Sequence, residues 1–466
     1  MSGRVKKAKK QFDFTQGGYL KPMLMFSIPV LFGDVFSVLY NVVDSIVVGQ
    51  YVGSHALAAV NSSFAITMVC VAIYAGFGMG SGVVIGQIFG AKQMENVRKA
   101  VATAFVGAFF VGITMSVVGL LISRPLLMAI NTPAEILDDA NIYLRIYMCG
   151  CATQLFYFMT SGLMRSMGDS QTPMQALILC AVLNIVLDIT FVVVFNMGCA
   201  GVALATVISQ ALSAVMVVSR VLMGTYGFKI GRKDLKLDFE ILIMILKVGV
   251  PSAIQQLVNS LGLLLVQSYA NSFGTNLVAS NGIIQKLDSF ALIPVQALGQ
   301  TITMFNAQNV GAGKLDRVKK GNQKAMTLIF AVGAIAGVFL FFCVGPMYRL
   351  FINPNDPGSA QILEIGQTSV QILAFFYCVT AIQQGYMAVL RGAGAAVPVM
   401  IIVIGSTIMY VPLTYLMAVR TGHYEGLYWA KNAFNTIMAV GVVCYYRFGN
   451  WQRFRAVKGP AGSAGD

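Results

Sequence analysis

The chain has 466 residues, of which 57% are hydrophobic and only 11% are charged. Soluble domains usually carry about 25% charged residues, so this composition excludes an ordinary soluble enzyme. The net charge of +14 does not indicate a nucleic-acid-binding protein, because Lys and Arg gather in short loops and at both termini.

Apolar runs of about 20 residues recur along the chain, and each can cross a ~30 Å hydrocarbon core as a helix. We therefore expect an all-α integral membrane protein with twelve transmembrane helices. In chain order they are predicted at residues 24–51, 56–86, 99–122, 140–165, 173–195, 201–223, 241–270, 277–305, 321–343, 361–390, 398–419 and 425–446.

Basic residues alternate between the predicted loops. The N-terminus, every second loop and the C-terminal tail hold most of the Lys and Arg, whereas the other loops hold none or one. The positive-inside rule therefore predicts that both termini are cytoplasmic.

The two halves of the chain repeat one another. The stretch "IPVLFGDVF" (28–36) resembles "VPSAIQQLV" (250–258), and "LMRSMGDSQTPM" (163–174) resembles "VLRGAGAAVPVM" (389–400), at an offset near 220–226. Six spans in each half bring both halves in from the same side. The pattern predicts two six-helix bundles related by a pseudo-two-fold axis along the membrane normal.

This repeat divides the chain into five predicted parts. They are a cytoplasmic N-terminal segment at 1–23, the first bundle at 24–223, a cytoplasmic linker at 224–240, the second bundle at 241–446 and a cytoplasmic tail at 447–466. Two bundles that rock against each other give alternating access, which favours a transporter over a duplication with a merely structural role.

Ionisable side chains inside a span are costly and indicate function by default. Asp44 and Asp188 are predicted at similar depth, Asn184 shares a helix face with Asp188, and Thr206 lies at a comparable level. Tyr40, one turn before Asp44, is placed to hydrogen-bond into this cluster. Two close carboxylates at low dielectric cannot both ionise cheaply, which favours a proton-coupling site. The alternative is a structural polar knot between these helices.

Seven further polar residues are candidates for a substrate cavity between the bundles. They are Asp34, Asn41, Gln255, Gln256, Asn259, Lys286 and Asp288. Asp34 lies ten residues before Asp44 and therefore on a different helix face. Lys286 and Asp288 do not face each other on a helix, and each is expected either in the cleft or against a buried polar neighbour. Nothing in the sequence places Lys431.

The Gly-rich run at 76–90 precedes no GK[ST] sequence, so it predicts close helix packing and not a phosphate-binding loop. The eight Cys fall mostly within apolar runs and predict neither a disulfide framework nor a metal site. No HExxH or GxSxG motif is present, and we expect no enzyme activity and no cofactor.

Three stretches in this order resemble the multidrug and toxic compound extrusion (MATE) family. They are "LYNVVDSIVVGQYVGSHALAAVN" (39–61), "GMGSGVVIGQIFGAKQMENVRKA" (78–100) and "LNIVLDITFVVVFNMGCAGVALAT" (183–206). The resemblance implies export of amphipathic, mostly cationic drugs from the bacterial cytoplasm across the inner membrane. It implies that inward flow of H⁺ or Na⁺ drives this export.

The resemblance is strongest to the proton-coupled, DinF-like branch of that family. In that branch an Asp in "YNxxD", an "NxxxD" pair and a Thr form a protonation site, and Asp44, Asn184, Asp188 and Thr206 match it. The sodium-coupled branch uses acids in the seventh and tenth helices, whose central parts carry Gln and Asn here.

We therefore expect a proton-coupled multidrug antiporter, present as a monomer in the bilayer and without a nucleic-acid partner. Two alternatives remain at this point. One is a Na⁺-coupled drug antiporter, and the other is a lipid-linked oligosaccharide flippase of the same superfamily.

Overall fold

The structure is a computed structural model that describes residues 12–352 and 358–455. All regular elements in this part of the chain are helices, which confirms the all-α prediction. The first half contains α1 (Leu20–Val47), α2 (Ser54–Gly90), α3 (Met94–Ala129), α4 (Ala134–Cys149), α5 (Cys151–Ser166), α6 (Gln171–Asp188) and α7 (Gly198–Leu222). The second half contains α8 (Phe239–Asn271), α9 (Thr275–Gly311), α10 (Leu315–Tyr348), α11 (Ser359–Ala374), α12 (Tyr377–Gly392), α13 (Ala396–Thr414) and α14 (Glu425–Phe448).

Eight helical runs in the described residues are long and apolar enough to cross a membrane. The pair α11 and α12, bent by 50° at a short break, makes a ninth such span. The fourth and tenth predicted spans are thus each divided into two helices, α4–α5 and α11–α12. Gly150 separates α4 from α5, where a Cβ atom would come within 2.8 Å of the Val207 side chain of α7.

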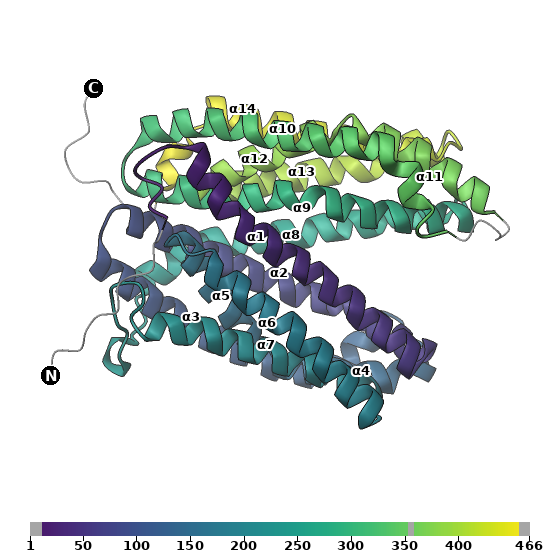
Figure 1. Ribbon diagram of the computed structural model, residues 1–466, viewed down its shortest axis with the longest axis horizontal. Coiled ribbons are helices and arrows are strands. Elements are labelled where there is room, and N and C mark those ends of the chain that lie inside the picture. The colour runs from purple at the N-terminus through teal and green to yellow at the C-terminus, as the bar shows by residue number, and fades with distance from the viewer. Residues whose placement is uncertain (1–11, 353–357, 456–466) are drawn as a thin grey trace.

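The predicted repeat is visible element by element, because α1–α7 recur as α8–α14 in the same order. Gly168 and Gly394 lie at matching turns with φ angles of 88° and 89°, a left-handed conformation that favours glycine. Helices α6 and α13 both continue into π-helical segments, Ile189–Val194 and Tyr415–Val419. Figure 1 shows the helices of the two halves as two bundles that converge where both termini lie.

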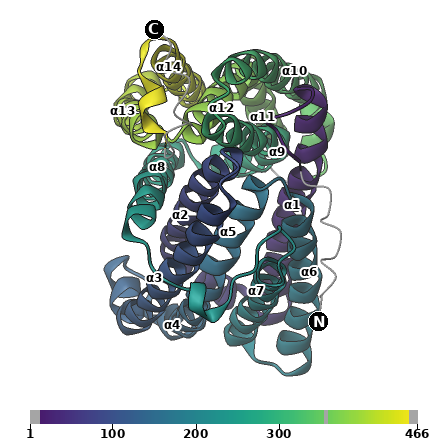
Figure 2. The same cartoon turned by 90° about the vertical axis from the view of Figure 1, so that its left-hand side faces the viewer.

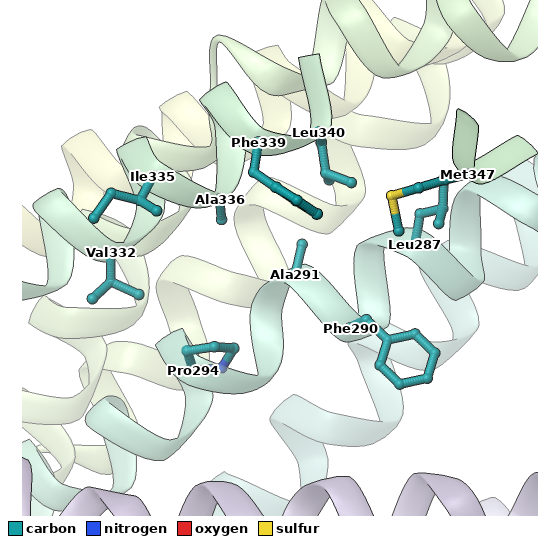
Figure 3. A pocket seen from close by; sticks show the side chains of 10 residues that line it. All are labelled: Leu287, Phe290, Ala291, Pro294, Val332, Ile335, Ala336, Phe339, Leu340 and Met347. Carbon is teal, nitrogen blue, oxygen red and sulfur yellow. The ribbon is translucent and has the colours of Figure 1, made fainter. Parts of the chain in front are cut away.

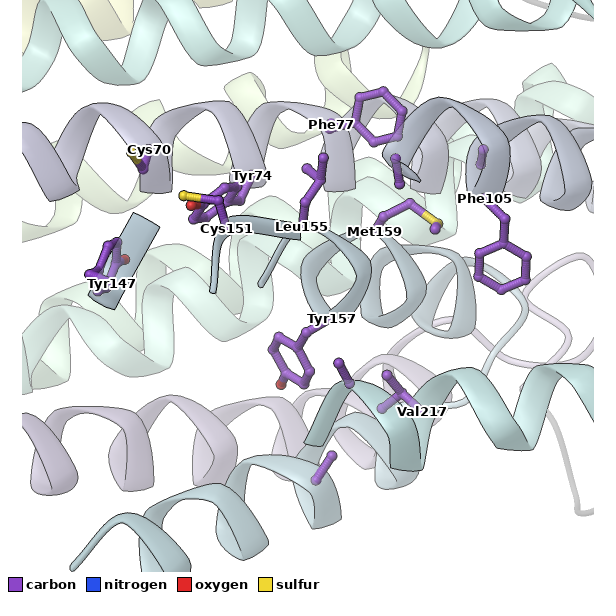
Figure 4. Packing of buried hydrophobic residues seen from close by; sticks show 14 of the residues in the cluster. Cys70, Tyr74, Phe77, Phe105, Tyr147, Cys151, Leu155, Tyr157, Met159 and Val217 are labelled. Carbon is purple, nitrogen blue, oxygen red and sulfur yellow. The ribbon is translucent and has the colours of Figure 1, made fainter. Parts of the chain in front are cut away.

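We call the end with both termini the closed end and the opposite end the open end. At the closed end α2 packs against α8 and α9, as the view in Figure 2 shows. The first bundle has one large apolar core, part of which is drawn in Figure 4. In that core the sulfur of Met148 lies 3.6 Å from Cys151 Sγ and 4.0 Å from Cys70 Sγ.

Helix α1 contacts both bundles. Its first turns pack with the second half, where Phe26 and Val30 belong to one buried cluster with Ile302 and Ile329. Its later turns pack against α6 of the first half. In Figure 1 this helix accordingly runs obliquely from one bundle towards the other.

Symmetric contacts join the bundles at the closed end. A Cβ atom on Gly90 would lie 1.9 Å from the Gln308 carbonyl oxygen, and one on Gly311 would lie 1.9 Å from the Gln87 carbonyl oxygen. The Gln87 side chain donates to the Gly392 carbonyl at 3.1 Å, and the Gln308 side chain donates to the Ser166 carbonyl at 2.7 Å. This confirms that the Gly-rich run of α2 serves close helix packing.

The segment before α1 adds a further tie between the bundles. Arg317 of α10 donates to four of its carbonyl groups, those of Phe14, Gln16, Gly17 and Gly18. On the other side the Phe12 amide donates to the Gly168 carbonyl of the first half at 3.1 Å. Residues 12–18 therefore bridge the two bundles at the closed end.

The contact between α2 and α9 predicts that Gly311→Ala destabilises the protein. The added methyl group meets the backbone of α2, and overpacking of this kind costs about 1–3 kcal/mol. A lower apparent unfolding temperature in detergent would show this. Gly299→Ala in the same helix is the control, because a Cβ atom there meets nothing within 4 Å. Equal unfolding temperatures for both variants would contradict the close contact.

Candidate functional site

Asp44 of α1 and Asp188 of α6 lie close to each other in the first bundle, although no hydrogen bond joins their carboxyl groups. A hydrogen bond between them would require that one of the two carboxyl groups is protonated, because an ionised carboxylate only accepts. Asp188 is the last residue of α6 and is fully buried. The structure thus brings together the two acids that the sequence pairs.

Asn184 lies one turn before Asp188 on α6 and is also fully buried. Neither atom of its side-chain amide has a hydrogen-bond partner, and the same holds for Asp44 Oδ1 and both carboxyl oxygens of Asp188. Buried polar atoms are nearly always hydrogen-bonded, so this concentration of five is unusual. It marks a place where a proton, a cation or water can be accommodated.

Two tyrosines of α4 complete the surroundings of this pair and were missed from the sequence. Tyr143 lies near Asp44, Asp188 and Tyr40. Its ring stacks with that of Tyr147 at 6.5 Å between centroids, and both side chains are buried. Their spacing of one turn on a predicted helix was the available signal.

Tyr40 and Thr206 lie on helices next to this pair. Tyr40 is on α1, near Tyr147 of α4. Thr206 is buried on α7, which packs against both α6 and α4. Roles for these residues in ion coupling remain a prediction.

The helices that carry the two acids change their backbone geometry next to them. Helix α1 becomes π-helical at Val48–Val52, one turn after Asp44, and α6 does so directly after Asp188. The two π-helical segments also contact each other. Such segments occur often at functional sites. The segment after α6 recurs after α13 and is part of the repeat, whereas the segment after α1 has no counterpart after α8 in the described residues.

Asp34 occupies a different place from Asp44, at the contact between the bundles. Its carboxylate accepts a hydrogen bond from Gln300 of α9 at 3.3 Å, and Gln300 accepts one from Arg165 of α5 at 2.6 Å. A chain of three side chains thus links both bundles near the closed end. The sequence offered Asp34 alone and gave no sign of its partners.

The cavity candidates of α8 differ in their exposure. Gln255 is buried, Gln256 is exposed and Asn259 is half-buried. The side chain of Asn41 lies outside the described part of the structure.

Asp288 of α9 is turned into the second bundle. Its carboxylate accepts hydrogen bonds from Tyr377, the first residue of α12, and from the ammonium group of Lys431 on α14. The side chains of Asp288 and Lys431 are 14% and 29% exposed, so water reaches this ion pair only in part. Asp288 was expected either in the cleft or against a polar neighbour, and the structure shows it against polar neighbours. Lys431, which the sequence did not place, lies beside it.

Lys286 points elsewhere, as its spacing from Asp288 predicts. It is exposed, and its ammonium group lies 5.4 Å from the centre of the Phe351 ring. Towards the open end, α8 and α9 also share a network of amide side chains, in which Gln267 accepts from Asn281 at 2.8 Å and from Gln285 at 3.0 Å. The sequence analysis did not identify this network.

Outside the spans, a buried contact holds the segment after α7 to the turn before α6. The Tyr226 hydroxyl donates to Asp169 at 2.9 Å. Burial, and then the neighbouring Asp169 carboxylate, raises the pKa of Tyr226 well above its usual value. Tyr226 therefore stays protonated at physiological pH and keeps its role as a donor. In the described residues no three His, Cys, Asp or Glu side chains gather as metal ligands would.

The ion pair between Asp288 and Lys431 predicts that a single variant is less stable than the double variant. Asp288→Asn leaves the Lys431 ammonium without its counter-charge and should destabilise the protein by up to about 3 kcal/mol. Adding Lys431→Met should restore most of that loss, because the unpaired charge is removed as well. Unfolding temperatures of the native, two single and double variants form the test. Additive losses in the double variant would show that the two groups do not interact.

Comparison with known proteins supplies the family. The family model MatE matches residues 29–190 and 251–416. The probable multidrug resistance protein YpnP of Bacillus subtilis is 27% identical over 448 residues, covering 96% of this chain and 99% of that protein. The multidrug export protein MepA of Staphylococcus saprophyticus is 22% identical over 439 residues, covering 94% of this chain and 95% of that protein.

Solved structures agree with this result. A MOP superfamily transporter from Pyrococcus furiosus, whose binding pocket is described as having reverse polarity, superposes with a TM-score of 0.86 at 25% identity. It covers 97% of this chain and 99% of its own. An outward-facing multidrug resistance MATE transporter shares the fold with a TM-score of 0.86 at 24% identity, over 97% of this chain and 99% of its own. The family model covers more than half of the sequence, in both repeats, so this chain belongs to the MATE family of multi-pass membrane transporters.

Proposed function

We propose that this protein exports amphipathic, mostly cationic drugs from the cytoplasm in exchange for protons that enter the cell. The observation that carries the proposal is the contact between Asp44 and Asp188 among buried polar atoms that lack partners. The names of the relatives, a multidrug resistance protein and a multidrug export protein, support the substrate class.

Binding and release of one proton at this pair can move α1. With one proton bound, the two carboxyl groups hydrogen-bond to each other and hold α1 against α6. When that proton leaves, two like charges face each other at low dielectric, and this arrangement becomes costly. Because the first turns of α1 pack on the second bundle, a shift of α1 changes how the bundles meet.

The same residues support protons over Na⁺ as the coupling ion. The only acid on α8 is Glu240 in its first turn, and α12 has none. In the second bundle, the carboxylate of Asp288 is already neutralised by Lys431. In the described residues of the second bundle, the acids of α8 and α11 without a basic partner, Glu240 and Glu364, lie in the first two turns of their helices, whereas Asp44 and Asp188 lie near each other inside the first bundle.

The drug is proposed to bind between the bundles on the open side of the Asp34–Gln300–Arg165 chain. Asp34 supplies a negative charge there, and Gln256 and Asn259 supply polar groups from α8. The amides of α8 and α9 towards the open end would line the path of release. The bundles at 24–223 and 241–446 would move as two bodies, with the closed end facing the cytoplasm.

The coupling role predicts that Asp44→Asn abolishes drug-dependent proton release while the protein remains folded. Asn keeps the size and most of the hydrogen-bonding capacity of Asp but does not titrate in this range. The measurement is the pH change when a cationic drug is added to purified protein in weak buffer, beside a thermal-unfolding control. Asp138→Asn serves as the matched control, because Asp138 is an exposed acid of α4 paired with Arg124 at the surface.

Wild-type proton release in Asp44→Asn would overturn the coupling role and favour the structural knot. Drug efflux from proteoliposomes distinguishes H⁺ coupling from Na⁺ coupling. An imposed pH gradient should drive the efflux in the absence of Na⁺. Efflux that requires a Na⁺ gradient and ignores the pH gradient would support the Na⁺-coupled alternative instead.

The distribution of basic loops predicts the orientation. In a chain whose eight Cys are replaced, Lys233→Cys at the closed end and His423→Cys at the open end are both at exposed positions. An impermeant thiol reagent added to intact cells should label position 423 and leave position 233 unlabelled until the cells are broken. The reverse pattern would invert the topology.

A further inference from the structure

Helices α9 and α10 enclose a groove on the second bundle that the proposed transport function does not use. Its lining is entirely apolar, and the groove has a volume of about 290 Å³. Figure 3 shows the lining side chains: Leu287, Phe290, Ala291 and Pro294 from α9, and Val332, Ile335, Ala336, Phe339, Leu340 and Met347 from α10.

The groove is lined by one face of each of the two helices. Its lining positions recur at helical spacing, three and four residues apart on α9 and mostly so on α10, so each helix presents one stripe. Ala291 and Ala336 leave space between the large rings of Phe290 and Phe339. In Figure 3 the Phe339 side chain points from α10 towards Ala291 on the facing helix.

The groove is longer than the hydrocarbon part of one bilayer leaflet. Met347 is the residue before the last of α10, so this end of the groove lies where that helix ends. From Met347 to Val332 the helix descends about 22 Å at 1.5 Å per residue. Half of a ~30 Å hydrocarbon core is about 15 Å, so the groove reaches from the interface past the bilayer middle.

The side chains along the groove are exposed although they are large and apolar. Ile335 is 69% exposed, Phe339 53% and Phe290 45%. In a membrane protein such a surface is covered by hydrocarbon chains. A binding site for a polar drug would need directional polar groups in its wall, and this wall has none.

Positive charge marks the end of the groove near the membrane surface. Lys286 precedes Leu287 and lies one turn before Phe290, so it shares a helix face with a groove residue. No acid among the described residues pairs with it. Arg349 follows Met347 by two residues at the end of α10. The nearest acid on α9, Asp288, is occupied by Lys431 and Tyr377 inside the bundle.

We propose that this groove holds one acyl chain of a phospholipid from the leaflet at the open end, with its anionic phosphate headgroup beside Lys286. The apolar stripe sets the depth of the chain, and the ammonium group sets the position and charge of the headgroup. This site is separate from the Asp44–Asp188 pair and does not depend on the proposed coupling.

Native mass spectrometry of the purified full chain tests the site. The probes are phosphatidylglycerol and phosphatidylcholine with identical acyl chains. We expect one phosphatidylglycerol to stay bound after detergent washing that removes other lipids. Ala336→Phe fills the groove and should abolish this retention, and Ala291→Phe fills it from the facing wall. Ala331→Phe is the matched control, because Ala331 is an exposed alanine of α10 outside the lining.

Lys286→Gln tests the headgroup contact separately. It should reduce the preference for phosphatidylglycerol over phosphatidylcholine about fivefold, the effect of one basic residue near an anionic headgroup. An unchanged preference would refute the headgroup contact. Retention in both groove-filling variants, or no retained lipid in the native chain, would overturn the site. If the groove-filling variants lost a bound cationic dye and not a lipid, the groove would be a drug-binding site and the lipid proposal would be wrong.

Discussion

The closeness of two acids, Asp44 and Asp188, inside the first bundle is the constraint on which the proposed mechanism depends. The pair joins α1 to α6, and no basic side chain in the described residues forms an ion pair with either acid. Two ionised carboxylates cannot be held together in such a place without strain, so one proton belongs to the intact contact. In the proposed mechanism, the position of α1 therefore depends on whether this proton is bound.

The backbone repeat makes it possible to ask whether the second bundle holds the same chemistry. Asp188 and Thr414 are the last residues of α6 and α13, each directly before a π-helical segment. The Thr414 hydroxyl donates to the Tyr410 carbonyl of its own helix. The acids of the first bundle thus have no acidic counterpart at this point. The second bundle instead pairs Asp288 with Lys431, which adds no net charge. The two bundles thus share a backbone fold, but only the first has a pair of acids at this position in the described residues.

The sequence predicted the parts that follow from local patterns. The apolar runs predicted the membrane spans, and the internal repeat predicted two bundles. The "NxxxD" spacing placed Asn184 and Asp188 on one helix face. Apart from Asp44 and Asp188, partners across helices were not predictable, because no local pattern encodes which distant side chain completes a hydrogen bond. Gln300 beside Asp34 and Lys431 beside Asp288 are of this kind. The break at the end of α11 also lacked a signal, since residues 374–377 contain neither Gly nor Pro.

The energies at the closed end are of the size that this proton can control. The bundles meet there through close glycine contacts and through hydrogen bonds from Gln87, Gln308 and Arg317. Each such bond contributes about 0.5–1.5 kcal/mol net, so together they stabilise the closed end by several kcal/mol. Two like charges about 4 Å apart repel by about 4 kcal/mol at an effective dielectric constant of 20. In the proposed mechanism, loss of one proton from the Asp44–Asp188 pair would act on α1 with a free energy of the same order as that which holds the bundles together. Because α1 packs on both bundles, that free energy can be passed to the closed end without any larger rearrangement of the cores.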